Sequence, residues 1–327
     1  MTLTAPSLAD VLVARRTIAP YLRPTALHPY PALDELLGTS VHVKHENHQP
    51  VGAFKVRGGV NLVAQLGDDE RRRGVIAAST GNHGQSIAYA ARLFGVRAIV
   101  CVPEKANPVK VASMAGLGAE IVAFGPDYDA AREHCETLAR EHGYRYVHSG
   151  DEPLLIAGVG TLYLEILEEE PGIDVIIVPI GGGSGAAAAC IVARAVKPGV
   201  RIIGVQSSAA PAAHRSWQER RMVEDTMGTY AEGLATRTAF ALPQQIMWEL
   251  LDKFVLVTDA EIRAAQALMI EKTRNLVEAA GAAPLAAALA MREQLAGKRV
   301  GLVLSGGNVS PQQLLDVLGD PGPNAGR

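Results

Sequence analysis

Short apolar runs alternate with longer helical stretches along most of this chain, and this alternation most limits what it can fold into. The clearest run, Val175–Ile180, is apolar throughout and precedes a helical stretch over Gly185–Val196. A strand that is apolar on both faces is typical of a parallel sheet covered by helices on both sides. An earlier series from Val75 to His148 repeats the pattern. We therefore expect an α/β protein with two open, twisted, mostly parallel sheets flanked by helices, in two domains with a cleft between them.

The second half of the chain contains less regular segments. Helical stretches are expected over Ala260–Ala279 and Pro284–Leu295, between strands at Phe254–Val257 and Arg299–Leu304. The polar segment Ser207–Tyr230 breaks the alternation. We expect a mobile or interface-forming excursion there.

Composition excludes several classes of protein. The 327 residues, 48% apolar and 20% charged, suit about two folded domains and exclude wholesale disorder. A net charge of −3 predicts neither a nucleic-acid partner nor an anionic membrane surface, and no apolar run approaches the roughly 18 residues of a membrane span. The cysteines, Cys101, Cys135 and Cys190, are odd in number and form no CxxC pair. A soluble protein in a reducing cytoplasm is expected.

The first candidate for chemistry is Lys55, which lies between Phe54 and Val56 and is followed by Arg57-Gly58-Gly59. Partial burial would lower the pKa of this amine and make it nucleophilic, as a Schiff-base lysine requires. Taken alone, a lysine that extends its charge to solvent at a helix start is the commoner explanation.

The second candidate is the stretch from Ser79 to Gln85, Ser-Thr-Gly-Asn-His-Gly-Gln, directly after an apolar strand and at the start of a helix. Backbone N–H groups at a helix N-terminus attract an anion such as a carboxylate. An ordinary capped turn explains the pattern about equally well.

The third candidate is the loop of Gly181, Gly182, Gly183, Ser184 and Gly185. Without Cβ atoms, such a loop can surround a phosphate with backbone N–H groups. It also matches the dinucleotide pattern G-x-G-x-x-A, but the next strand runs into Gln206 rather than an acidic residue for a ribose. A single phosphate is therefore preferred.

The fourth candidate is Ser305, followed by Gly306-Gly307-Asn308, at the end of an expected strand. Strand ends of open α/β sheets face the ligand crevice, so this hydroxyl could meet a ring nitrogen; a helix cap is the simpler alternative. An amine, a phosphate cradle, a carboxylate cradle and a neutral hydroxyl together suit a phosphorylated aldehyde cofactor that reacts with an amino acid.

These motifs resemble those of the fold-type II pyridoxal-phosphate (PLP) enzymes of the serine/threonine dehydratase and serine racemase family, whose fold is like that of the tryptophan synthase β subunit. The matching stretches are AFKVRGG, STGNHGQ, GGGSG, AEGLA and SGGN, in the family's order, and the similarity covers roughly residues 5 to 318.

The resemblance implies roles for individual residues. Lys55 matches the lysine that forms the Schiff base, Phe54 the aromatic residue beside the cofactor ring, and Asn82 the partner of the ring hydroxyl. The remaining residues are grouped by role: the phosphate loop Gly181, Gly182, Gly183, Ser184 and Gly185; Ser305 at the ring nitrogen and Glu278 near the cofactor; and Ser79, Thr80, Gly81 and His83 at the substrate carboxylate.

The resemblance also implies an organisation. Residues 1–73 and 150–327 would form a large PLP-binding domain, residues 74–149 a small substrate-binding domain, and the cofactor would lie in the cleft between them. A homodimer is expected. The family's divalent-cation site uses two acidic residues where this chain has Gln206 and Ala212. Hard cations require carboxylate oxygens, so we predict that this metal site is missing.

The implied reaction is the PLP-dependent dehydration and deamination of a β-hydroxy amino acid to a 2-oxo acid and ammonia. L-Threonine or L-serine is the simplest substrate; phenylserine or a hydroxyectoine-derived amino acid remains an alternative. A racemase is a second hypothesis, although Thr80 stands where racemases carry a serine. A dinucleotide-dependent oxidoreductase and a non-catalytic PLP or amino-acid-binding protein are the others.

Overall fold

Two sheets, each with its own helices, make up the computed structural model, which describes residues 4–319. One unit comprises the chain up to Arg23 together with Phe54–Val159; the other comprises Pro24–Ala53 and the chain from Gly160 onward. We refer to them as the first and second units.

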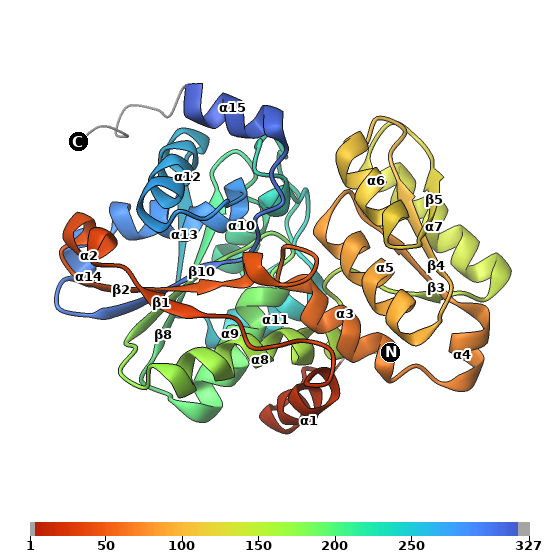
Figure 1. The fold of residues 1–327 in the computed structure, drawn as a ribbon, viewed down its shortest axis with the longest axis horizontal. Helices are drawn as coiled ribbons and strands as arrows, with labels where there is room; N and C mark the ends of the chain where they lie inside the picture. Colours follow the sequence, from red (N-terminus) through yellow and green to blue (C-terminus); the bar gives the residue numbers. More distant parts are fainter. Residues whose placement is uncertain (1–3, 320–327) are drawn as a thin grey trace. The chain divides into compact units, whose positions relative to one another are not determined.

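The first unit contains a parallel four-stranded sheet in the order β5-β4-β3-β6 (Figure 1). All residues of β3 (Val75–Ala78) and β4 (Ala98–Val102) are buried, because α5 (Asn82–Phe94) and α7 (Tyr128–His142) both pack on these strands. The other elements of this unit are β5 (Glu120–Ala123), β6 (Arg145–Tyr146), α1 (Leu8–Ile18), α3 (Lys55–Ala64), α4 (Asp68–Arg73) and α6 (Pro108–Gly116); α8 (Pro153–Glu169) contains the boundary between the units.

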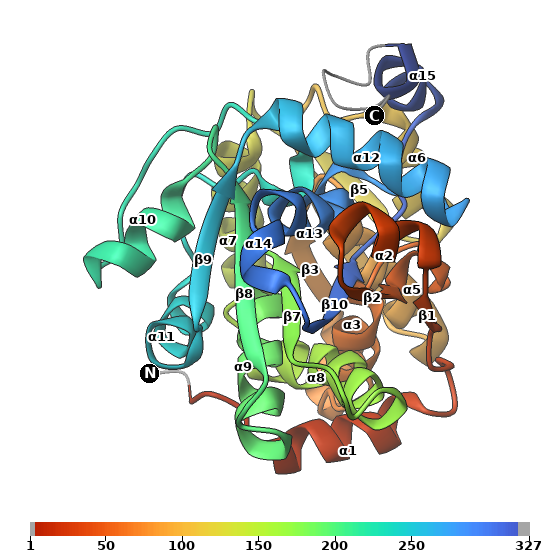
Figure 2. The same ribbon diagram turned by 90° about the vertical axis from the view of Figure 1, so that its left-hand side faces the viewer.

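The second unit contains a six-stranded sheet in the order β1-β2-β10-β7-β8-β9, in which only β1 and β2 pair antiparallel. Figure 2 shows its central strands side by side. The strands are β1 (Leu27–Pro29), β2 (Ser40–His45), β7 (Val175–Pro179), β8 (Arg201–Ser207), β9 (Lys253–Val257) and β10 (Arg299–Leu304). The helices are α2 (Pro31–Leu37), η1 (Glu46–His48), α9 (Ser184–Val196), α10 (Ala212–Glu219), η2 (Glu232–Leu234), α11 (Ala241–Leu250), α12 (Asp259–Thr273), α13 (Ala279–Ala290), α14 (Arg292–Leu295) and α15 (Pro311–Gly319). Both sheets confirm the predicted fold class.

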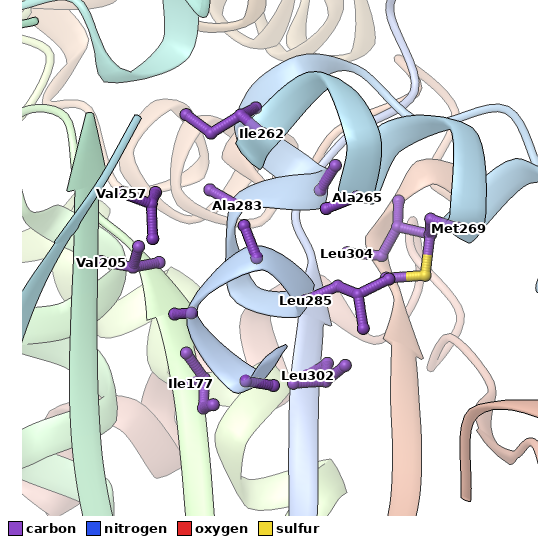
Figure 3. Packing of buried hydrophobic residues seen from close by; sticks show 14 of the residues in the cluster. Ile177, Val205, Val257, Ile262, Ala265, Met269, Ala283, Leu285, Leu302 and Leu304 are labelled. Atoms are coloured by element: carbon purple, nitrogen blue, oxygen red, sulfur yellow. The ribbon is translucent and has the colours of Figure 1, made fainter. Parts of the chain in front are cut away.

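The core of the second unit lies where α13 packs against the sheet (Figure 3). Ile177, Val205 and Leu302 on the strands meet Ala283 and Leu285 of the helix in one buried cluster. Because eight of the 12 residues of α13 are alanine, its axis can approach the strands closely. Its N-terminus is thereby held next to the ends of the central strands.

The expected domain boundaries differ from these units. The large domain is predicted to comprise residues 1–73 and 150–327, whereas the first unit, with the four-stranded sheet, includes the chain up to Arg23 and residues 54–73 and 150–159. The reason is packing of α3 on α5: a Cβ placed on Gly59 would lie 2.2 Å from the Ser86 Oγ. The division into a PLP-binding and a substrate-binding domain stays a prediction.

Two helix predictions in the second unit were wrong in their bounds. The helix expected over Ala260–Ala279 ends at Thr273, because Arg274 is left-handed with φ 58° and begins a connecting segment. The helix expected from Pro284 instead begins at Ala279 and contains Pro284. Burial of the alanine-rich face against the sheet outweighs the hydrogen bond that proline omits.

The segment Ser207–Tyr230 contains a helix, α10, and is tied down at both ends. The hydroxyls of Ser207 and Thr229 donate to the Asp259 carboxylate at 2.6 and 2.7 Å, and the Trp217 Nε1 donates to the Met247 carbonyl at 2.9 Å. These contacts attach the excursion to α12 and α11. Its role in subunit contact stays a prediction. Separately, no helix found between residues 4 and 319 is long and apolar enough to cross a bilayer.

Candidate active site

Lys55 is the first residue of α3, in the first unit, and its side chain is largely withdrawn from solvent. Its Nζ donates to the Ser149 carbonyl at 2.9 Å and lies 5.3 Å from the centre of the Phe54 ring. Burial lowers the pKa of the Lys55 amine from 10.5 to about 8. Far more of this amine is therefore unprotonated near neutral pH than of a lysine with the ordinary pKa, and the unprotonated form is the nucleophile.

The turn between β3 and α5 is organised by Ser79. Its Oγ accepts hydrogen bonds from the backbone N–H groups of Gly81 at 3.1 Å and Gly84 at 2.9 Å. Gly84 has no room for a side chain, since a Cβ there would lie 2.3 Å from the Met114 Sδ. The Ser79 hydroxyl therefore shapes the turn, and the partly exposed Thr80 and Asn82 lie at its surface. Direct contact of Ser79 with a substrate stays a prediction.

His83, at the start of α5, is buried and neutral. Its Nε2 donates to the Val147 carbonyl at 3.1 Å, which assigns the proton to Nε2. Burial and, secondarily, the charge of Lys55 lower the pKa of His83 to about 3. Its Nδ1 finds no hydrogen-bond partner among residues 4–319. This side chain can accept a hydrogen bond but cannot pair as a cation with a carboxylate.

In the second unit, the glycine loop follows β7 and opens α9. Gly183 adopts a left-handed conformation with φ +89° at the N-cap of α9. As the N-cap residue, Gly183 has no side chain with which to cap the helix. The backbone N–H groups of the first turn thus form the kind of anion site that a helix N-terminus provides.

The first two glycines of this loop are required by close packing on the loop's other side. A Cβ on Gly181 would lie 2.2 Å from the Gly233 carbonyl oxygen, and one on Gly182 would lie 1.9 Å from the Phe240 ring. Gly233 comes from the AEGLA stretch, for which the sequence suggested no role. Phe240 carried no sequence signal, because its contact with the glycine loop is to a residue 58 positions earlier in the chain.

Ser305 and Glu278 lie together at the end of β10. Ser305 is buried directly after the strand. The Glu278 N–H donates to the Gly306 carbonyl at 3.1 Å, and a Cβ on Gly306 would lie 2.5 Å from the Glu278 carboxylate. Since β10 and β7 are adjacent parallel strands, Ser305 and the loop after β7 both lie at the carboxyl ends of the strands.

The structure therefore divides the predicted residues into two groups. Lys55, Phe54 and the turn Ser79–His83 belong to the first unit, whereas the loop Gly181–Gly185, Glu278 and Ser305 belong to the second. The chain passes from one unit to the other at Ala53–Phe54, immediately before Lys55.

These residues fit pyridoxal phosphate. Close packing excludes side chains at Gly181, Gly182 and Gly183, and the glycine N-cap of the following helix leaves backbone N–H groups that suit a phosphate. Lys55 supplies an amine with a lowered pKa for an aldehyde. Ser305 supplies a neutral hydroxyl at the strand edge. The assignment of each residue to an atom of the cofactor stays a prediction.

The positions of the family's metal ligands carry no carboxylate in this chain. Gln206 is buried and its Oε1 accepts from the His214 N–H at 3.1 Å, while Ala212 begins α10. Within the described chain, no group of three or more histidine, cysteine, aspartate or glutamate side chains is placed to hold a metal ion. The missing metal site stays a prediction.

Comparison with known proteins agrees with this chemistry. Residues 18–306 match the family described as "Pyridoxal-phosphate dependent enzyme". The chain is 42% identical over 286 residues to the L-threonine ammonia-lyase of Geobacter sulfurreducens, with 87% of this chain and 71% of the relative covered. It is 36% identical over 314 residues to the L-threo-3-hydroxyaspartate ammonia-lyase of Saccharomyces cerevisiae, with 96% of each covered.

Solved structures show the same fold. The processed form of threonine deaminase isoform 2 from Solanum lycopersicum superposes with a TM-score of 0.90 at 28% identity, covering 97% of this chain and 95% of that one. The serine racemase of Dictyostelium discoideum gives a TM-score of 0.88 at 33% identity, covering 94% and 100%. The cofactor shared by this family agrees with the interpretation of the glycine loop as a site for a single phosphate.

Proposed function

The chain belongs to the family of pyridoxal-phosphate dependent enzymes, and from this premise we propose that it is an ammonia-lyase acting on a β-hydroxy amino acid. L-Threonine or L-serine is the simplest substrate. The products are a 2-oxo acid and ammonia, and their atoms add up to those of the substrate without an oxidant or reductant. The observation that carries the proposal is the largely buried Lys55 amine, with its lowered pKa, in a chain similar to characterised ammonia-lyases.

Pyridoxal phosphate, when bound, stabilises negative charge on the α-carbon of the amino acid. Lys55 would hold the aldehyde, and once the amino group of the substrate takes its place there, the freed Lys55 amine would accept the α-proton. The loop Gly181–Gly185 holds the phosphate through backbone N–H groups. Ser305 would offer the ring nitrogen a hydroxyl rather than a carboxylate, which would favour a neutral ring and hence elimination over transamination.

The turn Ser79–His83 orients the substrate carboxylate in this proposal. The N-terminus of α5 attracts an anion, whereas the neutral His83 adds no positive charge to this attraction. Its Nδ1 can only accept, so it suits an N–H or O–H of a ligand and disfavours a carboxylate oxygen. The carboxylate therefore binds the backbone and hydroxyl donors of the turn.

The substrate within this class is decided by the group on the β-carbon. The two ammonia-lyases reported above act on substrates with a methyl group and with a carboxylate at that position, by their names. Phenylserine and a hydroxyectoine-derived amino acid are bulkier candidates. Racemisation is a second activity supported by the similarity to a serine racemase, with Thr80 in the place of the racemase serine.

The decisive experiment is an assay of 2-oxo acid and D-amino acid formation from L-threonine, L-serine, L-threo-3-hydroxyaspartate and phenylserine. We expect 2-oxo acid from at least one substrate with wild-type protein, none with Lys55→Ala, and wild-type rates with Lys105→Ala, an exposed lysine in the same unit. Only D-amino acid would indicate a racemase. No product from any substrate, in protein loaded with PLP, would contradict the proposal.

A further inference from the structure

The segment that leads into Lys55 is held against the turn after β10 by a short antiparallel bridge and by one side-chain hydrogen bond. The Gly307 N–H donates to the Gly52 carbonyl at 2.9 Å. The Asn308 Nδ2 donates to the Val51 carbonyl at 2.8 Å. The first of these hydrogen bonds is part of the isolated antiparallel β-bridge between Ala53 and Gly306. All of these residues belong to the second unit, so the contacts are internal to it.

Asn308 is the only side chain in this set of contacts, and it holds the segment on two sides. While its Nδ2 binds Val51, its Oδ1 lies against Gly52, where an added Cβ would be 2.7 Å away. Gly52 itself is left-handed, with φ +66°. A glycine loses more conformational freedom on ordering than any other residue, so this position depends on its neighbours to stay ordered.

The residues held by these contacts, Val51 to Ala53, come shortly before Lys55 in the chain, so the contacts affect where Lys55 lies. Ala53 is completely buried and is the last residue of the second unit before the chain passes to the first. Lys55 follows two residues later, a chain length of at most about 7 Å. On the other strand of the bridge, Ser305 directly precedes Gly306. The turn that carries Ser305 therefore also holds the backbone from which Lys55 follows.

We infer that Asn308 is a positioning residue for Lys55: through Val51 and Gly52 it holds the backbone that presents the Lys55 amine to the cofactor aldehyde. This inference rests on the proposed function, because it assumes that Lys55 binds the aldehyde. It assigns to Asn308 a role in forming the lysine–cofactor bond in addition to its role in the fold.

The test uses the full chain and pyridoxal phosphate itself. Asn308→Ala removes the side-chain contacts, and Asn308→Asp keeps the size while replacing the donor to Val51 with an acceptor. The matched control is Thr39→Val, which removes a hydroxyl that donates to the Leu295 carbonyl at 2.9 Å in the same unit. Thr39 directly precedes β2, so it lies at the amino ends of the parallel strands, whereas the turn after β10 lies at their carboxyl ends.

Three quantities are measured for each variant: the melting temperature without cofactor, the Kd for PLP, and the yield of Lys55 adduct after borohydride reduction, by mass spectrometry. For both Asn308 variants we expect the Kd for PLP to rise roughly 3- to 10-fold, which is the effect of losing one hydrogen bond. We also expect a lower yield of Lys55 adduct at equal PLP occupancy. Thr39→Val should lower the melting temperature and leave the Kd and the adduct yield unchanged.

Either of two results would overturn the inference alone: Asn308 variants with wild-type Kd and adduct yield, or a Thr39→Val variant that loses PLP affinity as much as they do. Wild-type protein that forms no adduct on Lys55 would overturn the proposed function, and this inference with it. The wild-type measurement therefore distinguishes the two failures.

Discussion

Replacing Gly182 with alanine should weaken PLP binding, because the ring of Phe240 already occupies the space that the added methyl group needs. The new Cβ would lie 1.9 Å from the Phe240 Cε2 and 2.2 Å from its Cδ2, whereas ordinary contact begins at 3.4 Å. The backbone at Gly182 is not left-handed, so the substitution adds a clash and no conformational strain. The ring or the loop must therefore move by about 1.5 Å.

The size of the effect follows from this overlap. Inserting an extra methyl group into a well-packed region typically costs about 1–3 kcal/mol. If the loop moves, it must be forced back into the shape that binds the phosphate, and the same free energy then weakens PLP binding. The Kd for PLP rises by about 5- to 150-fold, since 1.4 kcal/mol corresponds to a factor of ten. If the ring moves instead, the same cost appears as a lower free energy of unfolding.

The assay is a titration of Gly182→Ala, Phe240→Ala and the double variant with PLP, together with urea unfolding of each. Removing the ring makes room for the methyl group, so the double variant should bind PLP better than Gly182→Ala, with a coupling energy of about 1 kcal/mol or more. Gly199→Ala is the control, since a Cβ there meets nothing within 4 Å. Wild-type affinity and stability in Gly182→Ala, or no recovery in the double variant, would refute this reasoning.

Three further predictions concern buried groups. The folded-state pKa of Lys55, about 8, lies below its ordinary 10.5, so the unfolded chain binds more protons between these pH values. The unfolding free energy of the cofactor-free protein should therefore gain a component that rises with pH over that range, and Lys55→Met should lack this component in urea titrations. His83 should stay neutral with its proton on Nε2 from pH 8 to pH 5, as read from ¹⁵N chemical shifts; titration near pH 6.5 would contradict its burial. Lys44, fully buried, pairs with Glu165 at 2.6 Å, so Lys44→Met should cost roughly 3 kcal/mol of unfolding free energy; a loss below about 1 kcal/mol would show that the pair contributes little.

The strands of both sheets could be predicted because their apolar runs report burial directly. Val175–Ile180 corresponds to β7, Val175–Pro179, and Val75–Ser79 to β3, Val75–Ala78. The helix α3 has no such signal. Gly58 and Gly59 disfavour a helix in isolation, but their lack of side chains lets α3 pack against neighbours, since a Cβ on Gly58 would lie 2.8 Å from the Leu155 carbonyl oxygen. At Gly58 and Gly59, close packing outweighs the local preference against a helix.

The amino-acid sequence by itself determined which chemical groups are available: an amine at Lys55, a loop without side chains at Gly181–Gly183, and a hydroxyl at Ser305. These groups follow from residue type and from short-range order along the chain. Only the tertiary structure decided the pKa of the Lys55 amine and the packing that holds the glycine loop in its shape. The Lys55 amine binds a carbonyl 94 residues away, and the glycine loop is backed by Phe240. A pKa, a tautomer or a close contact depends on neighbours that folding brings together, and no local pattern of residues specifies those neighbours.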